Sequence, residues 1–319
     1  MAGYNEIRGL RVKYLSADPA NPEDGQVWYN STTGNLRVDG MVLAAAWASG
    51  GNLNTARNSL GSFGTQTASV GVAGNVTPAN TNVTEEYNGS SWTSVTNYPG
   101  SLRWPEGTGT LTAGIVAGGG PSRVTTVNKY DGTNWTSANS IPTATDAGVM
   151  FGVQDSCVYA LGYNGSNTGA SYEFDGTNWT NGGTASTARR ELAGSGILTA
   201  GLVFGGSPAT AATEEYNGTS WTGGGNLGTA RYGLAGSNAG TQTSSLAFAG
   251  GNPAITTNEK YNGTSWSSDA SVATATRFLA GTGTSSSALK FGGYTGTVNS
   301  TSTEEYTGAA TQIKNISVS

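Results

Sequence analysis

Histidine is absent from this chain of 319 residues, and the single cysteine is Cys157. Without histidine, Ser-His-Asp and Cys-His catalytic arrangements are excluded, as are zinc and copper sites with imidazole ligands. A lone cysteine cannot form an intrachain disulfide, so we expect Cys157 to be a small buried residue on a strand. We therefore predict no catalytic residue, no metal site and no cofactor.

Charge is also scarce, since only 11% of the residues are charged and the formal net charge is −5. Nucleic-acid binding needs clustered positive charge, and no run of lysine or arginine is present, so we expect no nucleic-acid partner. The first eight residues lack the basic and apolar regions of a signal peptide, and no stretch of about 18 apolar residues occurs. We expect neither export by a signal peptide nor insertion into a membrane.

Glycine is abundant, with 50 residues, and one short motif repeats along the chain. The motif Tyr87-Asn88-Gly89-Ser90-Ser91-Trp92 recurs four times, and an eroded copy begins at Tyr306. Its tryptophan, together with one in the same register near the N-terminus, recurs every 42 to 45 residues. Such a period predicts a ring or stack of small sheets, because one unit cannot bury its apolar face alone. The six tryptophans are Trp47, Trp92, Trp135, Trp179, Trp221 and Trp266.

The clearest unit, residues 229–266, predicts a meander of four strands. Residues 231–236, 245–249 and 257–261 form the first three expected strands, and Trp266 opens the fourth. Asn262-Gly263 favours a tight hairpin between the last two strands because both residues tolerate positive φ. Four-stranded units that close around an axis leave only short edges, which protects an all-β chain from aggregation.

Gly-Gly pairs end the second strand of four units, and a tyrosine precedes Trp92, Trp135, Trp221 and Trp266 by five residues. In these features residues 42–310 resemble kelch-type β-propellers, with a shorter Tyr-to-Trp spacing. The resemblance implies an all-β fold, a six-bladed kelch-like β-propeller. The sequences of the repeats, such as Thr-Glu-Glu-Tyr-Asn-Gly-Thr-Ser-Trp, are similar to those of propellers in marine bacteriophage structural proteins. This resemblance implies a virion protein. The glycine pairs are Gly118-Gly119, Gly205-Gly206, Gly250-Gly251 and Gly292-Gly293.

Residues 1–40 form a separate predicted segment, and residues 41–319 the propeller. Residues 25–38 predict a hairpin, which is marginal alone and would fold against a partner chain or another copy. The segment resembles the N-terminal attachment segments of phage tail fibres, which implies docking on other virion proteins. Residues 42–48 are expected to complete the sixth blade beside Tyr306, although the terminal residues 312–318 compete for that place.

Repeated residues are most simply structural. We expect each tryptophan to bury roughly 200 Å² between neighbouring blades. Arginines recur at the start of the first strand and glutamates two residues before the tyrosine, so we predict buried Arg–Glu ion pairs such as Arg57 with Glu85 and Arg231 with Glu259. The arginine set is Arg57, Arg103, Arg189, Arg231 and Arg277, with Asp146 in the third unit; the glutamate set is Glu85, Glu214, Glu259 and Glu304, with Tyr172 in the third unit.

Binding is expected where the copies differ, which is the face that carries the loops between second and third strands and the links between blades. The position after the recurrent arginine varies and should lie near the channel mouth, where aromatic and arginine side chains can stack on a sugar or grip a protein. Ordinary packing between blades is the competing interpretation. The candidate ligand-binding residues are Trp104, Arg190, Tyr232 and Phe278.

The leading hypothesis is a non-enzymatic bacteriophage virion protein, a tail fibre or appendage that assembles as a homo-oligomer on the particle. Its propeller would engage a host cell-surface receptor, with a glycan as one candidate. A purely structural capsid or neck decoration is the alternative. A carbohydrate-active enzyme that uses carboxylates is the third, although no convincing catalytic pair of carboxylates is evident.

Overall fold

The computed structural model describes residues 12–20 and 26–315, and all regular structure in these residues is β. Among them there is no helix, and hence none that could cross a membrane. Cys157 is buried on a strand, as predicted. The chain divides into two compact units, one made of Met1–Ala45 and Gly308–Ser319 and the other of Ala46–Thr307.

The first unit is built on one four-stranded sheet in the order β1-β2-β3-β28. Strand β1 (Lys13–Leu15) pairs in parallel with β2 (Val27–Asn30), which pairs antiparallel with β3 (Asn35–Leu43). The last strand, β28 (Ala310–Asn315), lies antiparallel to β3. The C-terminal segment therefore belongs to this sheet and does not compete for the sixth sheet of the second unit.

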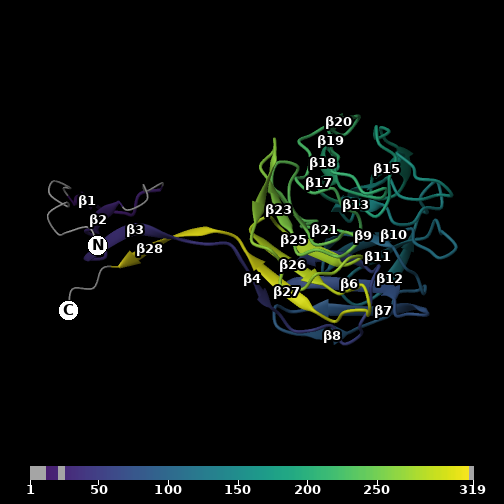
Figure 1. The fold of residues 1–319 in the computed structure, drawn as a ribbon, viewed down its shortest axis with the longest axis horizontal. Helices are drawn as coiled ribbons and strands as arrows, with labels where there is room; N and C mark the ends of the chain where they lie inside the picture. Colours follow the sequence, from purple (N-terminus) through teal and green to yellow (C-terminus); the bar gives the residue numbers. More distant parts are fainter. Residues whose placement is uncertain (1–11, 21–25, 316–319) are drawn as a thin grey trace. The chain divides into compact units, whose positions relative to one another are not determined.

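The second unit contains six antiparallel sheets of four strands, here called sheets 1 to 6. Five of them are consecutive meanders, and sheet 6 takes its fourth strand from the start of the unit (Figure 1). The strands are, in sheet 1, β5 (Gly61–Thr65), β6 (Ala68–Asn75), β7 (Asn80–Tyr87) and β8 (Trp92–Ser94); in sheet 2, β9 (Glu106–Thr110), β10 (Ala113–Ala117), β11 (Val127–Tyr130) and β12 (Trp135–Ala138); in sheet 3, β13 (Val149–Val153), β14 (Ser156–Ala160), β15 (Ser171–Phe174) and β16 (Trp179–Asn181); in sheet 4, β17 (Ala193–Ile197), β18 (Ala200–Phe204), β19 (Thr213–Tyr216) and β20 (Trp221–Gly223); in sheet 5, β21 (Ala235–Gly236), β22 (Ser245–Phe248), β23 (Asn258–Tyr261) and β24 (Trp266–Asp269); and in sheet 6, β25 (Ala280–Gly283), β26 (Ser287–Phe291), β27 (Thr303–Thr307) and β4 (Ala46–Ser49).

The repeated motif forms the hairpin between the third and fourth strands. In each of sheets 1 to 5 its first aromatic residue lies directly opposite its tryptophan, as Tyr216 does opposite Trp221. The Asn217 side-chain oxygen accepts hydrogen bonds from the backbone N–H groups of Thr219 and Ser220, at 3.0 and 2.9 Å. Gly218 has a φ of 89°, a conformation that glycine adopts without a Cβ clash. Asparagine and glycine are therefore explained by turn geometry.

The six sheets form a closed ring. The N-terminal strand β4 completes sheet 6, with Trp47 opposite Tyr306, as predicted. The predicted bounds of 42–48 are wrong at the start, because Val42 and Leu43 belong to β3 and pair with β28. First strands of successive sheets contact one another from β5 to β25, and β25 contacts β5 again. In Figure 1, β9, β13 and β21 accordingly lie toward the middle of the unit, and β8 and β20 toward its outside. This arrangement of antiparallel sheets is consistent with a β-propeller.

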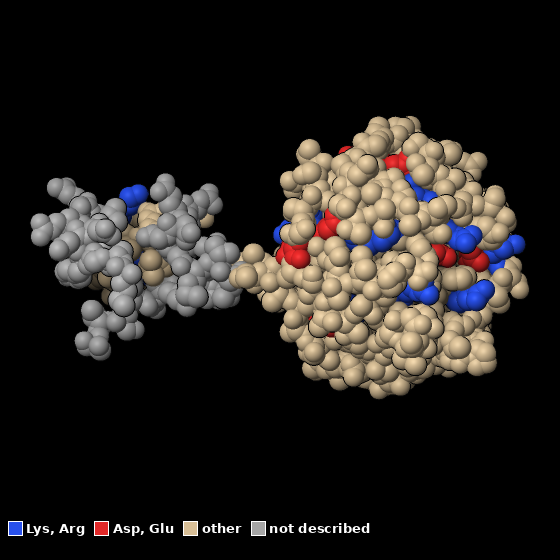
Figure 2. Space-filling view, in the orientation of Figure 1, with Lys and Arg blue, Asp and Glu red and all other residues tan. Residues whose placement is uncertain are grey.

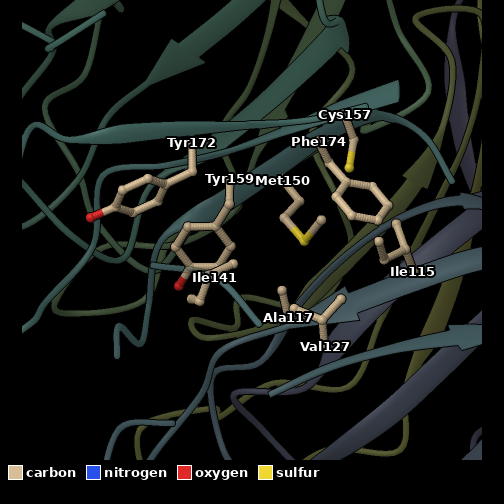
Figure 3. Close-up of a cluster of buried hydrophobic side chains, with 9 residues drawn as sticks. All are labelled: Ile115, Ala117, Val127, Ile141, Met150, Cys157, Tyr159, Tyr172 and Phe174. Atoms are coloured by element: carbon tan, nitrogen blue, oxygen red, sulfur yellow. The ribbon is translucent and has the colours of Figure 1, made fainter. Parts of the chain in front are cut away.

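Each repeated tryptophan packs against the sheet that precedes its own. The ring of Trp266 lies 4.7 Å from that of Phe204 in sheet 4, and Trp92 lies 4.6 Å from Phe291 in sheet 6. The indole N–H of Trp266 also donates to Thr213 at 3.0 Å. Trp92 is buried and the other five are half-buried. The prediction that each tryptophan packs between neighbouring sheets is therefore confirmed, but five of them are less buried than expected. Figure 3 shows the core between sheets 2 and 3, where Ile115 and Cys157 belong to one cluster.

The tyrosines of the motif join neighbouring sheets through carboxylates. Tyr261 donates to Glu215 of sheet 4 at 2.7 Å, and Tyr130 donates to Glu86 of sheet 1 at 2.7 Å. Sheet 3 has Phe174 in place of tyrosine, and the residue of sheet 2 that would accept the bond is Lys129, whose amine lies 5.1 Å from the Phe174 ring. Losing the hydroxyl thus coincides with losing the carboxylate, which avoids an unpaired buried group.

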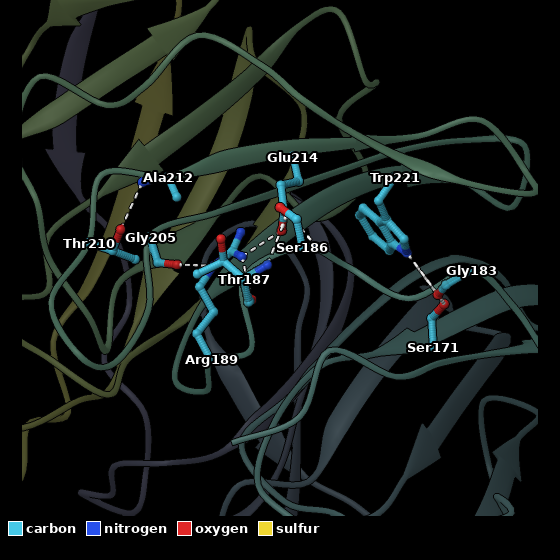
Figure 4. Close-up of polar contacts among 10 residues, drawn as sticks. All are labelled: Ser171, Gly183, Ser186, Thr187, Arg189, Gly205, Thr210, Ala212, Glu214 and Trp221. Atoms are coloured by element: carbon cyan, nitrogen blue, oxygen red, sulfur yellow. Dashed lines mark hydrogen bonds and ion pairs between the residues drawn. The ribbon is translucent and has the colours of Figure 1, made fainter. Parts of the chain in front are cut away.

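Three of the predicted Arg–Glu ion pairs are present and buried. Arg57 pairs with Glu85 at 2.5 Å and Arg189 with Glu214 at 2.6 Å, and Arg231 pairs with Glu259. Figure 4 shows Glu214 also accepting from Ser186 and Thr187. Burial alone would raise the pKa of Glu214, but the hydrogen bonds from Ser186 and Arg189 more than offset this and lower it.

The prediction that Arg103 and Arg277 belong to this buried set is wrong. Each lies one residue further along, because Leu102 and Thr276 occupy the position of Arg231 in sheets 2 and 6. In sheet 3 that position is Thr145, not Asp146. Glu304 pairs instead with Lys290 of the adjacent strand β26, at 2.7 Å. A shift of one residue along the link turns a side chain to the other side of the backbone. The side chain then leaves the space between neighbouring sheets and lies near the central axis.

The first strand of sheet 5 is also shorter than expected. Strand β21 covers only Ala235–Gly236, whereas residues 231–236 were predicted as a strand. Residues 231–233 are used differently, because the Arg231 backbone bonds to Thr210 of sheet 4 and the Gly233 backbone to Glu191 and Phe278. These contacts between sheets replace the pairing within the sheet.

Candidate functional site

The candidate site lies where the links between sheets enter the first strands. Six residues, one from each link, join in a continuous cycle of backbone hydrogen bonds in which each N–H donates to the carbonyl of the preceding link, and Ser59 donates to Phe278 to close it. Five of the six have positive φ between 51° and 56°, and the sixth is a glycine with a φ of 60°. We call these the ring residues: Ser59, Trp104, Ala147, Glu191, Gly233 and Phe278.

A central cavity is lined by the ring residues and the beginnings of the first strands. Most of its wall is small, with glycine or alanine at many positions, so the backbones of all six sheets approach it. The larger side chains on the wall are of two kinds. Glu106 and Glu191 are acidic, and the others are apolar or aromatic: Leu60, Trp104, Met150, Leu192, Leu234, Phe278 and Leu279. The indole nitrogen of Trp104 is buried without a hydrogen-bond partner among the described residues.

The residues that directly precede the ring residues form a second layer, which we call the rim. Isolated bridges join the rim to the loops between second and third strands, as Arg103 bridges Gly120 and Arg277 bridges Tyr294. The links and these loops therefore share one face, as the meander topology predicted. The rim residues are Asn58, Arg103, Asp146, Arg190, Tyr232 and Arg277.

Arginines of the rim and of one neighbouring loop are stacked on aromatic rings. Arg103 lies 4.5 Å from the Trp104 ring centre, and Arg277 lies 5.2 Å from Phe278 and 5.6 Å from Tyr294. Arg190 and the loop residue Arg123 lie 4.7 and 5.3 Å from Tyr163. Stacking on ring faces holds a guanidinium in place while its N–H edge stays available for an anion.

The distribution of arginine in the second unit is uneven. Residues 46–307 contain seven arginines, of which three are the buried partners of glutamates and the other four are Arg103, Arg123, Arg190 and Arg277. Figure 2 shows basic side chains across the middle of the visible face of this unit, with acidic side chains beside several of them, on an otherwise largely neutral surface. Charged side chains of the second unit therefore gather on part of its surface, and four of its seven arginines belong to the site.

Carboxyl groups beside the arginines are poorly hydrated. Burial raises the pKa of Asp146, and the charges of Arg123, Arg103 and Arg190 oppose this rise. Burial likewise raises the pKa of Glu191, against Arg190, which lies 3.3 Å away. Burial, with the charge of Asp146, raises the pKa of Glu106 well above its usual range. Each shift reflects the free-energy cost of burying an ionised carboxylate at this site.

The four predicted ligand-binding residues all lie at this site, in two different layers. Trp104 and Phe278 are ring residues on the cavity wall, with ring centres 6.4 Å apart. Tyr232 and Arg190 belong to the rim, and the Tyr232 ring lies 6.1 Å from Phe278. The aromatic residues therefore form one connected group, with Arg190 on a different part of the rim beside Tyr163.

Sequence reasoning missed Arg103 and Arg277 at the site because it assigned them to the buried ion pairs. The signal that separates them is their distance from the next apolar residue, since Arg231 stands three residues before Leu234 and Arg277 only two before Leu279. Glu106, Arg123 and Glu191 carried no repeat signal. Their proximity follows only from closing the ring.

The chemistry available here is recognition of an anion and of hydroxyl groups. Among the residues that the structure describes, no group of three or more acidic or cysteine side chains could hold a metal ion. Arginines offer N–H donors, the Trp104 indole offers one more, and Glu106 and Glu191 offer oxygen acceptors.

No protein-family model matches the chain, and no curated protein matches it. Among solved structures, one described as "Structure of YjhT" is similar with a TM-score of 0.68 and 13% identity, over 83% of this chain and 100% of that chain. At this level of identity the likeness concerns the fold alone. It supports the assignment of the chain as an all-β protein with a propeller-like arrangement of sheets.

Proposed function

We propose that this protein is a non-enzymatic component of a bacteriophage virion, a tail fibre or appendage whose six-bladed kelch-like propeller recognises a ligand on the host surface. Two resemblances support the virion assignment: that of the repeat sequences to bacteriophage propellers and that of residues 1–40 to attachment segments of tail fibres. The central site supports recognition, because aromatic and arginine side chains gather there on a rigid frame.

The observation that carries the proposal is the state of three guanidinium groups. Within residues 12–20 and 26–315, the side chains of Arg103, Arg123 and Arg277 make no hydrogen bond or ion pair, and they stack on ring faces. The other rim arginine, Arg190, has only Glu191. The three buried arginines each have a carboxylate partner, whereas these three have none where six links converge, which favours a bound partner.

The first unit is proposed as the attachment to the particle. Tyr14 of β1 is 76% exposed, and Val12 beside that strand is also exposed. Exposed apolar side chains at the edge of an open sheet suit a contact with another virion protein or another copy of the chain. Because β28 pairs with β3, deleting residues 1–40 alone would remove β1, β2 and the half of β3 that pairs with Ile313–Asn315. Attachment is therefore best tested with the full chain.

Two measurements test the proposal together. Immunogold electron microscopy of phage particles shows whether and where the protein is displayed, and flow cytometry of the labelled full-length chain measures binding to a panel of bacteria. We expect labelled particles, and cell binding that is reduced by R103Q/R277Q but not by K260Q, which also removes a positive charge. Labelled particles without any cell binding would favour a purely structural decoration. Release of sugar from host envelopes would favour an enzyme.

A further inference from the structure

We propose that the ligand of the central site is an acidic saccharide, with the anionic group of a sugar unit at the rim arginines and its hydroxyl groups at the cavity wall. This inference rests on the proposed function and specifies the chemistry of the ligand. A carboxylate and a sulfate ester share the required feature, which is an oxyanion on a sugar ring.

The first argument is the balance of charge. Four arginines, Arg103, Arg123, Arg190 and Arg277, face Asp146 and Glu191, and no other arginine of residues 46–307 is exposed to solvent. Asp146 is only 6% exposed and lies in the field of three of the four. Positive charge therefore exceeds negative charge at the rim, and the excess is matched by an anionic ligand.

The second argument is the unused hydrogen-bonding capacity. The side chains of Arg103 and Arg277 have no hydrogen-bond partner among the described residues, whereas Arg57 and Arg231 leave only their Nε atoms unpaired; the buried indole nitrogen of Trp104 also has no partner. Buried donors of this kind cost free energy unless something accepts from them. On the same wall, Glu106 and Glu191 can accept hydrogen bonds. Donors and acceptors on one wall can bond to the hydroxyl groups of a sugar, and the apolar residues beside them can contact its C–H groups.

The third argument is the aromatic surface. Trp104, Phe278 and Tyr232 form a connected group beside the cavity. Flat apolar faces beside polar groups accommodate the C–H faces of a sugar ring. A nucleic acid is less suited, because binding a phosphate backbone needs a basic track, and the arginines here surround a single mouth on an acidic protein.

Isothermal titration of the full-length protein tests this with three probes of equal length: an oligogalacturonate, a sulfated galactan oligosaccharide and a neutral galactan oligosaccharide. We expect at least one acidic probe to bind roughly tenfold or more tightly than the neutral one, since a hydrogen bond to a charged group contributes about 1.5–3 kcal/mol. Which acidic probe binds distinguishes carboxylate from sulfate.

Variants connect that binding to the site. R103Q and R277Q should each lower the affinity for the acidic probe about tenfold, and W104F should lower it several-fold by removing the indole N–H. K260Q is the matched control, because it removes one positive charge from the second unit outside the rim, and it should leave binding unchanged. Thermal melts that match the wild type establish that each variant is folded.

Three results would overturn the inference: equal binding of the neutral probe, no binding of any probe, or equal losses in R277Q and K260Q. Tighter binding of a single-stranded oligonucleotide than of either acidic sugar would also overturn it. Failure of the proposed function is distinguishable, because cell binding that persists while acidic sugars fail to bind contradicts only the ligand chemistry. Binding of acidic sugars without any binding to cells contradicts only the host-recognition role.

Discussion

Replacing Arg231 by leucine is expected to destabilise the second unit strongly. Arg231 is 1% exposed and pairs with Glu259, and its guanidinium also donates to the backbone carbonyl of Ala247 at 3.0 Å. The substitution leaves the carboxylate of Glu259 buried, with the Gly228 N–H as its remaining donor among the described residues, at 2.6 Å. Removing one member of a buried ion pair costs about 3–5 kcal/mol.

Sheet 2 provides the matched double variant, since Leu102 and Asn128 occupy the positions of Arg231 and Glu259 there. R231L/E259N places the same two side chains in sheet 5 and leaves no buried charge, although Leu227 stands where Tyr98 bonds to Asn128 in sheet 2. We expect each single variant to lose about 3–5 kcal/mol and the double variant to lose about 2 kcal/mol less than their sum. K260L, which alters an unpaired lysine on the same strand, should change stability by no more than about 0.5 kcal/mol.

Urea unfolding followed by tryptophan fluorescence measures these differences where unfolding is reversible. Otherwise melting temperatures serve, and a loss of 3–5 kcal/mol corresponds to roughly 6–20 °C for a unit of this size. Strict additivity of the two single losses would refute the reasoning, because it would mean that Arg231 and Glu259 do not interact in the folded state.

Three further predictions follow from contacts between sheets and from burial. A Cβ at Gly201 would lie 2.2 Å from the Phe151 ring of the preceding sheet, so G201A should cost about 1–3 kcal/mol in urea unfolding, and F151L should recover part of this loss. Burial, together with a hydrogen bond to a carboxylate, raises the pKa of Tyr87, Tyr216 and Tyr261 to about 12. Because the phenols of the unfolded chain ionise first, the stabilisation that these tyrosines give the folded state is complete below pH 10 and is lost toward pH 12. An unchanged urea midpoint from about pH 9 to 12 would contradict this. Burial raises the pKa of the Cys157 thiol, so we expect no reaction with a thiol reagent in the native protein and full reaction in denaturant, and rapid native labelling would be the contrary result.

Much of the architecture could be predicted from patterns among residues close in sequence. Asn-Gly turns and opposed Tyr–Trp pairs depend on residues close in sequence, so the hairpins between third and fourth strands could be placed in advance. Trp47 could be matched to sheet 6 by register alone. The pairing of β28 with β3 could not, because alternation in residues 312–318 suits an edge in either unit.

Predicting the residues of the site required an alignment of the six repeats that is correct to one residue. Arg57, Arg189 and Arg231 point to glutamates between sheets, whereas Arg103 and Arg277, one position further on, belong to the rim. Repeats of 42 to 45 residues differ by insertions in loops, so counting along the chain does not fix that single position. Backbone hydrogen bonds between links do fix it.

The amino-acid sequence by itself determined that this protein is built of repeated four-stranded sheets, because turn chemistry, alternation and the tryptophan period act over short distances. Only the tertiary structure decided which charges are paired and which stay free. That distinction depends on closing the ring, which brings side chains from six separate links to one axis and buries the others between sheets.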